Sequence, residues 1–298
     1  MPSLDFLIWL QQFRSGFTDA LFVGASALGA EEAYMALLTA IYLCVGHRFG
    51  FHLFVMFLAS AYSNSQLKAL ADTHRPFLLH PQLNPLYPGS AEGQSFPSGH
   101  AQNAAVVWGI IAIRQRSARV RVAIIALVLL IALSRLYLQV HWPVDVIGGL
   151  ASGLLLVLIY LIAVGVWASR QCDPGRVAWA LVIVIGSALM FLFGYHEATC
   201  VRSTGALLGS GLGYLLLERR GGFRAAAPPL NQVVKVIVAL AVLAGVQHGG
   251  RALLGEAAWA TVLRYTLIGF TAAYVLPVFF TVWHERRERR LASRGAGV

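Results

Sequence analysis

Charged residues and cysteines are both scarce in this chain of 298 residues. Only 12% of the residues are charged and 58% are hydrophobic, a balance that excludes an ordinary water-soluble domain of this size. The three cysteines, Cys44, Cys172 and Cys200, lie far apart, which argues against a disulfide framework and against a CxxC metal site. The Asp, Glu and His residues show no metal-ligand spacing, so we expect neither a metal ion nor another cofactor. The composition predicts an integral membrane protein.

Long apolar runs fill most of the chain and predict an all-α, polytopic bundle of about nine transmembrane helices. The runs lie near residues 19–45, 50–70, 100–113, 122–140, 144–168, 177–195, 204–217, 233–254 and 258–283. Two of them, 100–113 and 204–217, are shorter than the roughly 20 residues that usually cross a bilayer, so each must recruit flanking residues or lie within the bundle. Residues 1–14 mix Phe6 and Trp9 with polar side chains, which is typical of an interfacial helix.

The chain divides into two predicted regions. Residues 1–168 comprise the interfacial helix and a transmembrane core with the polar motifs described below, and residues 169–298 form a trailing helix bundle with a basic tail. The turn-forming sequence Cys172-Asp173-Pro174-Gly175 lies between them. Glycines spaced four residues apart predict close helix packing in both regions. They are Gly149 and Gly153 in the core and Gly205, Gly209 and Gly213 in the trailing bundle.

The distribution of basic residues predicts the topology. Lys and Arg number 23 against 13 Asp and Glu, for a net charge of +10. If odd-numbered runs cross toward the cytoplasm, most of the basic residues fall on one side, including those of the tail after Trp283. The positive-inside rule makes that side cytoplasmic and puts the polar motifs on the non-cytoplasmic face of the cell membrane. Because spans separate the basic loops, we expect membrane lipids and not nucleic acid as partners, with no prediction of oligomeric state.

The first polar motif, Lys68-x6-Arg75-Pro76, follows the second apolar run. Lys68 is one of only two lysines in the chain, and a charge at the end of a membrane helix is costly and usually functional. Arg75 is about two helical turns further on, so both cations face one direction if the helix continues that far, and Pro76 then ends it. Taken alone, the motif is equally compatible with a lysine that reaches the headgroups and an interfacial arginine.

The second motif, Pro97-Ser98-Gly99-His100, opens the third run after a polar loop that contains several prolines. A serine at the N-cap, the bare amides of Gly99 and His100, and the positive end of the helix dipole together predict an anion site. The alternative for this motif by itself is an ordinary helix cap with a surface histidine.

The third motif contains Ser134, Arg135, His141 and Asp145. Pro143 fits the first position of the fifth transmembrane helix, so Asp145 lies in its first turn and can accept a hydrogen bond from His141. That bond would fix the tautomer of His141 and leave its other nitrogen to attack phosphorus. An interfacial His–Asp pair is the alternative for the motif alone, but three such motifs on one membrane face favour a single phosphate site.

Together the three motifs resemble the signature of the type 2 phosphatidic acid phosphatase superfamily and match it at every specified position. The resemblance covers roughly residues 20–165. It implies that His141 is the nucleophile of a phosphohistidine mechanism, that Asp145 orients it, and that His100 protonates the leaving oxygen. The residues implied to hold the phosphate oxygens are Lys68, Arg75, Ser98, the Gly99 amide and Arg135. Preorganised cations of this kind can replace the divalent metal of other phosphatases.

The substrate is a separate question, because the superfamily covers several chemistries. Membrane embedding favours a phosphorylated lipid: undecaprenyl diphosphate, phosphatidic acid, phosphatidylglycerol phosphate or a long-chain base phosphate. A weaker likeness, Leu28-Gly29…Glu32…Tyr34 with the trailing bundle, is similar to sphingosine-1-phosphate phosphatases and their bacterial relatives. The alternatives are a small sugar phosphate, as in glucose-6-phosphatase, and a transporter or flippase of a phosphorylated lipid. A complete nucleophile and acid pair favours hydrolysis, since transport needs neither group.

Overall fold

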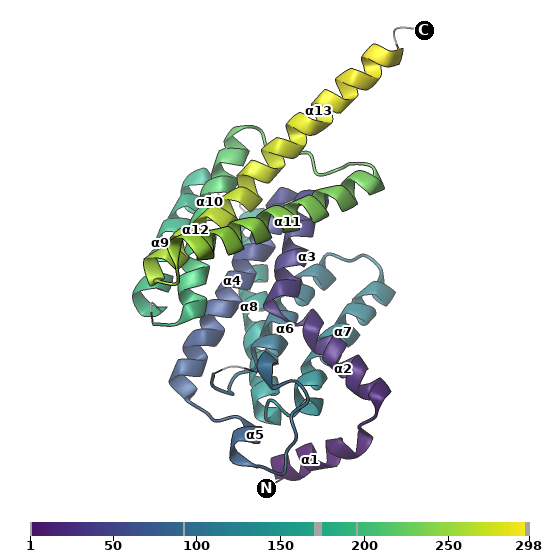
Figure 1. The fold of residues 1–298 in the computed structure, drawn as a ribbon, viewed down its shortest axis with the longest axis vertical. Helices are drawn as coiled ribbons and strands as arrows, with labels where there is room; N and C mark the ends of the chain where they lie inside the picture. Colours follow the sequence, from purple (N-terminus) through teal and green to yellow (C-terminus); the bar gives the residue numbers. More distant parts are fainter. Residues whose placement is uncertain (1, 92, 170–174, 195, 296–298) are drawn as a thin grey trace. The chain divides into compact units, whose positions relative to one another are not determined.

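The computed structural model describes residues 2–91, 93–169, 175–194 and 196–295, and every regular element within them is helical, as the sequence predicts (Figure 1). From the N-terminus the elements are α1 (Pro2–Leu10), η1 (Gln11–Phe13), α2 (Gly16–Leu28), α3 (Glu31–Cys44), α4 (His47–Ala71), α5 (Pro76–Leu79), η2 (Pro88–Ser90), α6 (Gly99–Ile113), α7 (Ala118–Tyr137) and α8 (Pro143–Ser169). They continue with α9 (Arg176–Gly194), α10 (Ala198–Arg219), α11 (Pro229–Leu254), α12 (Ala258–Phe270), the π-helical η3 (Thr271–Val275) and α13 (Leu276–Gly295). Cys172 and most of the turn predicted at 172–175 lie outside the described residues.

Six helices among the described residues are long and apolar enough to cross a membrane. They are α7, α8 over Pro143–Trp167, α9, α10, α11, and the continuous stretch Ala258–Arg286 formed by α12, η3 and the start of α13. Helices α2 and α3 form a pair bent by 55°, which makes a seventh span if the pair crosses as one. The chain is therefore a multi-pass membrane protein.

The expected number of about nine spans is not confirmed. Each of the nine apolar runs contains a helix or the bent pair, but α4 and α6 are not among the helices that meet the criteria for a span. Helix α6 has only 15 residues, and the 25 residues of α4 include Lys68 and a stretch of small polar side chains.

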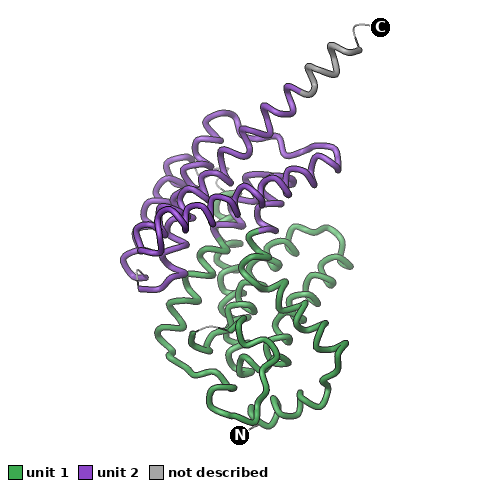
Figure 2. Tube along the Cα trace, in the orientation of Figure 1, with its two compact units in different colours: residues 1–35, 56–172 green, residues 36–55, 173–298 purple. Residues whose placement is uncertain are grey.

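The chain forms two compact units (Figure 2). The first comprises residues 1–35 and 56–172, and the second comprises residues 36–55 and 173–298. Helices α3 and α4 thus contribute to both units, whereas all three polar motifs lie in the first. The division predicted at residue 168 stays a prediction about how the chain is organised.

Helix α6 is the central helix of the first unit. Its residues from Ala101 to Val107 are all buried, and it packs against α7 and α8. Helices α6 and α8 approach closely at Gly149, where an added side chain would collide with the carbonyl oxygen of Ser98. In the second unit, a side chain at Gly209 of α10 would likewise collide with the carbonyl oxygen of Thr266 in α12. Glycine spacing predicts both contacts.

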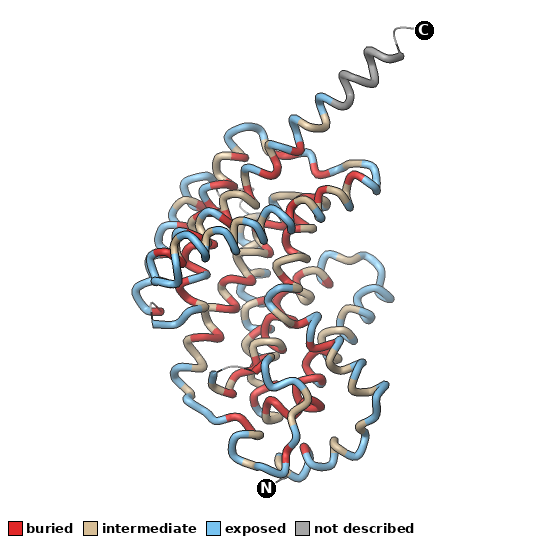
Figure 3. Tube along the Cα trace, in the orientation of Figure 1, coloured by how far each residue is buried: buried red, intermediate tan, exposed pale blue. Residues whose placement is uncertain are grey.

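Buried and exposed residues alternate along the helices of the first unit (Figure 3). The buried set includes polar and charged side chains as well as apolar ones, and many apolar side chains are exposed. Along α7, Ile125, Leu129 and Leu133 are exposed, whereas Ser134 and Arg135 are completely buried. This arrangement suits a helix surrounded by lipid, and the polar interior marks the part of the unit where a charged ligand can be held.

Candidate active site

Lys68 and Arg75 lie on either side of the turn between α4 and α5. The two cations do not lie on one helix, because α4 ends at Ala71 and Asp72 adopts a positive φ of 42°. Pro76 instead begins α5, and Arg75 is its extended N-cap residue. The two cations nevertheless converge, since Lys68 Nζ and Arg75 Nη2 both donate to the carbonyl of Gln94, at 3.0 and 3.2 Å.

Arg75 joins the loop that precedes α6 to the turn that carries His141. Its Nε donates to the Gly93 carbonyl and its Nη1 to the Val140 carbonyl, each at 2.9 Å. Nη1 also lies 3.2 Å from Nε2 of His141. Burial lowers the pKa of Arg75 to about 10, against the opposing attraction of Asp145, so the guanidinium stays charged at neutral pH.

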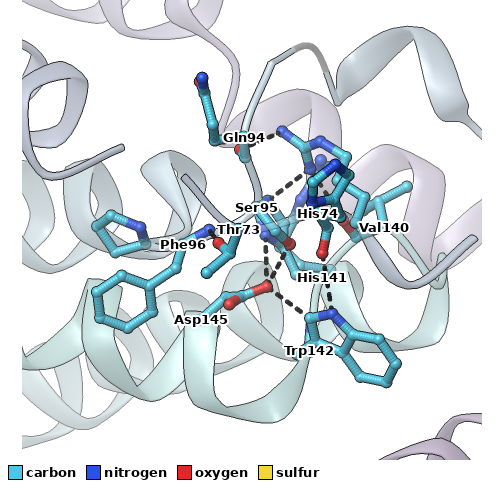
Figure 4. A network of polar contacts seen from close by, with 12 residues as sticks. Thr73, His74, Gln94, Ser95, Phe96, Val140, His141, Trp142 and Asp145 are labelled. Atoms are coloured by element: carbon cyan, nitrogen blue, oxygen red, sulfur yellow. Dashed lines mark hydrogen bonds and ion pairs between the residues drawn. The ribbon is translucent and has the colours of Figure 1, made fainter. Parts of the chain in front are cut away.

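His141 and Asp145 form a buried pair at the start of α8 (Figure 4). His141 Nδ1 lies 3.3 Å from Asp145 Oδ2, and the same oxygen accepts hydrogen bonds from Ser95 Oγ at 2.5 Å and from the Trp142 amide at 2.8 Å. An arginine can only donate, so the contact with Arg75 requires an unprotonated Nε2 on His141. The proton therefore resides on Nδ1, facing Asp145, and Nε2 is the basic nitrogen.

Several positive charges surround the His141 ring. Burial, and after it the charges of Arg135, Arg75 and Lys68, hold the pKa of His141 well below its ordinary value of 6.5. The ring is consequently neutral at pH 7, which is the form that can act as a nucleophile.

This lowered pKa predicts how His141 titrates. In the ligand-free protein its imidazole resonances should keep their neutral shifts between about pH 8 and pH 6, while an exposed histidine with an ordinary pKa titrates in that range. Below pH 6.5, His141 binds a proton in the unfolded chain but not in the folded one. The contribution of His141 to the free energy of unfolding therefore decreases as the pH falls. NMR of histidine-labelled protein tests the prediction, with His141→Ala identifying the resonance. A midpoint near 6.5 would contradict it.

The second motif lies at the start of α6, as the sequence predicts. Ser98 is the N-cap residue, but its hydroxyl makes no capping bond. Its amide donates to the Asp145 carbonyl at 2.9 Å, which ties the start of α6 to the first turn of α8. The lack of a side chain at Gly99 lets Asn64 pack closely, since a Cβ added at Gly99 would lie 3.1 Å from Asn64 Oδ1. His100 lies within electrostatic range of Lys68, Arg75, Arg135 and His141.

Arg135 completes the set of cations. It is fully buried, and it donates through Nη1 to the Ser26 hydroxyl and through Nη2 to the carbonyl and hydroxyl of Ser90, at 2.9 and 3.1 Å. The structure thus brings all eight predicted site residues into the first unit, where the three cations donate to the carbonyls of Ser90, Gly93 and Gln94.

Three buried polar atoms of this site have no hydrogen-bond partner among the described residues. They are Ser98 Oγ, His100 Nε2 and Arg135 Nε. Buried polar groups are almost always paired, because an unpaired one costs about 1–3 kcal/mol. Ser98, His100 and Arg135 each offer one such atom, and together with Lys68 and Arg75 they form a site suited to an anion.

Sequence reasoning missed the residues that hold these groups in place. Ser95 donates to Asp145, and Asn64 Nδ2 donates to the Pro97 carbonyl at 3.3 Å and to Gln102 Oε1 at 2.9 Å. Gln102 in turn donates to the Ser60 carbonyl. The polar stretch within the apolar sequence of α4 is the available signal for Asn64. No group of three or more His, Cys, Asp or Glu residues in the described ranges is placed to hold a metal ion.

Comparisons with known proteins match two parts of the chain. Residues 49–169 match the PAP2 superfamily, and residues 201–287 match the transmembrane extension of PAP2 superfamily phosphatases. The chain is 38% identical over 74 residues to phosphatidylglycerophosphatase B of Bacillus subtilis (strain 168). That match spans 22% of this chain and 36% of the relative's length.

Two solved structures are also similar. One is described as a transmembrane PAP2 type phosphatidylglycerolphosphate phosphatase from Bacillus subtilis, with a TM-score of 0.47 and 25% identity over 53% of this chain and 82% of that one. The other is Aquifex aeolicus LpxE, with a TM-score of 0.46 and 23% identity over 54% of this chain and 95% of that one.

Proposed function

Because the chain belongs to the PAP2 superfamily, we propose that it is a membrane phosphatase that hydrolyses the phosphate or diphosphate group of a lipid through a phosphohistidine intermediate. The observation that supports this most directly is the set of three unpaired buried atoms, Ser98 Oγ, His100 Nε2 and Arg135 Nε, together with the two further cations Lys68 and Arg75. A tetrahedral phosphate group offers enough acceptor oxygens to satisfy them.

Phosphate binding would give the three cations strong acceptors. Lys68, Arg75 and Arg135 each donate to a backbone carbonyl, that of Gln94, Gly93 and Ser90 respectively. Hydrogen bonds from these cations to anionic phosphate oxygens are roughly twice as strong as bonds between neutral groups. If Arg75 Nη1 bonds to a phosphate oxygen in place of His141 Nε2, the lone pair that attacks becomes available.

The chemical step then uses the two histidines in separate roles. His141 Nε2 forms a bond to phosphorus while the bond from phosphorus to the leaving oxygen breaks. His100, which takes up a proton when the anionic phosphate binds beside it, gives that proton to the leaving oxygen. Asp145 stabilises the positive imidazole through Nδ1. Water, deprotonated by His100, next attacks phosphorus and displaces His141, which releases inorganic phosphate and restores both histidines. Ser98, the Gly99 amide and the cations stabilise the charge that develops on the phosphate oxygens.

We propose a phosphorylated lipid as the substrate and the non-cytoplasmic membrane face as the place of reaction. The lipid preference rests on the apolar exterior of the first unit, whose helices would leave an acyl chain in the bilayer while its headgroup meets the buried cations. The similarity to phosphatidylglycerophosphatase B makes phosphatidylglycerol phosphate the first candidate among the lipids to be tried. The face follows from the positive-inside argument.

Phosphate release from a lipid panel tests this function. Purified protein in nanodiscs should release phosphate from at least one of phosphatidylglycerol phosphate, phosphatidic acid, undecaprenyl diphosphate or a long-chain base phosphate, with a metal chelator present. Vanadate should inhibit, because it imitates five-coordinate phosphorus. Arg75→Gln should reduce the rate at least about a hundredfold, as the loss of one stabilising donor does, whereas Arg251→Gln, on an exposed arginine of the second unit, should not. Turnover only with an added divalent metal would contradict the proposed mechanism.

A further inference from the structure

The N-terminal helix α1 and the short η1 that follows it have two different faces. The inner face packs against other helices of the first unit through Leu7, which is completely buried. Leu7 belongs to a hydrophobic cluster whose other buried members are Leu83, Ala101, Ala132, Leu136 and Val146. Trp142 packs against the same cluster. The inner face therefore belongs to the same cluster as Val146 and Trp142, which are the immediate neighbours of Asp145 and His141.

The outer face carries a stripe of exposed aromatic side chains, which we call the aromatic stripe. It consists of Phe6, Trp9 and Phe13, which are 37%, 48% and 50% exposed. The rings touch one another along the helix, with centroid distances of 5.9 Å from Phe6 to Trp9 and 4.7 Å from Trp9 to Phe13. Asp5 and Gln12 are exposed on a different flank. An aromatic stripe beside a polar flank is the pattern of a helix that lies in a membrane interface.

Gln139 connects this helix to the turn that carries His141. It is completely buried, lies two residues before His141, and has a positive φ of 61°, which is unfavourable for a residue with a side chain. Its Nε2 donates to the Leu7 carbonyl at 3.0 Å. Its Oε1 accepts from the Asn84 amide at 2.9 Å and from Gln11 Nε2 at 3.3 Å. The Gln139 side chain thus fixes an otherwise unfavourable turn against α1 and η1.

We propose that α1 and η1 form a membrane-surface anchor, whose aromatic stripe docks in the headgroup region of the bilayer, and that Gln139 is a positioning residue through which the docked helix holds His141 in place. We assign a phospholipid surface as the partner of the aromatic stripe. Helix α1 packs at the end of α7 and α8 that also carries the site, and α7 and α8 are helices that cross the bilayer (Figure 1). The stripe has no basic residue, so zwitterionic lipid is sufficient for docking. Only the role of Gln139 rests on the proposed function.

Nitroxide labels at single cysteines test the anchor in the full chain, with Cys44, Cys172 and Cys200 replaced by serine. In nanodiscs of phosphatidylcholine, labels at positions 6 and 13 should be accessible to oxygen and shielded from a water-soluble nickel chelate. Labels at positions 5 and 12 should show the reverse. Equal nickel access at all four positions would overturn the anchor. Shielding of positions 6 and 13 from both reagents would also overturn it, because it would mean that a second copy or another protein covers the stripe.

Gln139→Asn tests the positioning role. Asparagine tolerates a positive φ and keeps the amide, but it is one methylene too short to bridge Leu7 and Asn84. We expect kcat to fall at least fivefold with an unchanged KM and unchanged label accessibility, whereas the same substitution at exposed Gln12 leaves kcat as it was. Unchanged kcat in Gln139→Asn would refute the role. If thermal unfolding shows that this variant does not fold, Gln11→Asn must lower kcat instead. Absence of turnover in the parent protein would refute the proposed function, while the labels would still decide the anchor.

Discussion

His141→Ala is expected to lower kcat for lipid phosphate hydrolysis by about 10⁴-fold or more, the size of effect seen when a nucleophile is removed. The reason is that Nε2 of His141 is a basic nitrogen beside Arg75, and Nδ1 of the same ring faces the carboxylate of Asp145. The ring of His100 lies near the same cations, but no carboxylate among the described residues orients it in the way that Asp145 orients His141. Phosphate release by the purified variant in nanodiscs measures the effect, with thermal unfolding as a check on folding.

The matched control is His74→Ala, which removes an exposed histidine whose backbone carbonyl, and not its ring, bonds to Trp142. We expect it to keep near-normal activity. Asp145→Asn should fall between the two, with a loss of about 10³–10⁴-fold, because the imidazole loses its charged partner while the nucleophile remains. Activity in His141→Ala equal to that in His74→Ala would exclude His141 as the nucleophile.

His100→Ala is expected to give the second largest effect, and one that depends on the substrate. General acid catalysis contributes about 10²–10⁴-fold, and the contribution is greatest when the leaving oxygen is strongly basic. A lipid alkyl phosphate should therefore lose at least about a hundredfold in kcat, whereas an aryl phosphate, which leaves with little proton assistance, should lose much less.

The ratio of the two rates is the informative quantity in this experiment. A variant that merely disturbs the packing of His100 against Gly29 would slow both substrates equally. Equal losses for alkyl and aryl phosphates would therefore contradict an acid role for His100 and favour a role in phosphate binding.

The sequence predicts the candidate site well because its motifs lie next to helix ends. Each of the eight residues is within a few residues of the start or end of α4, α5, α6, α7 or α8, and such positions follow from proline, glycine and apolar patterning. The unpaired hydroxyl of Ser98 is different. Helix capping rules predict that it bonds to its own helix, and only the structure reveals that it does not.

Contacts between distant residues are the part that the sequence does not predict. Ser95 donates to Asp145, 50 residues away, and nothing local distinguishes Ser95 from other serines in a polar loop. Gln139 contacts Leu7 across 132 residues and adopts a backbone conformation that its residue type disfavours. The seven-residue spacing of Lys68 and Arg75 suggested one helix face, but the turn at Asp72 aligns the two cations instead. Tertiary packing sets all three features.

Trapping of a phosphoryl group on His141 tests the central claim most directly. A labelled lipid phosphate is mixed with the protein and the reaction is quenched within one turnover. We expect a phosphoryl group on His141 that is labile in acid and stable in base, as a phosphoramidate is, and that is missing in His141→Ala. Turnover at the normal rate with no trapped phosphoryl group, or with the group on His100, would contradict it.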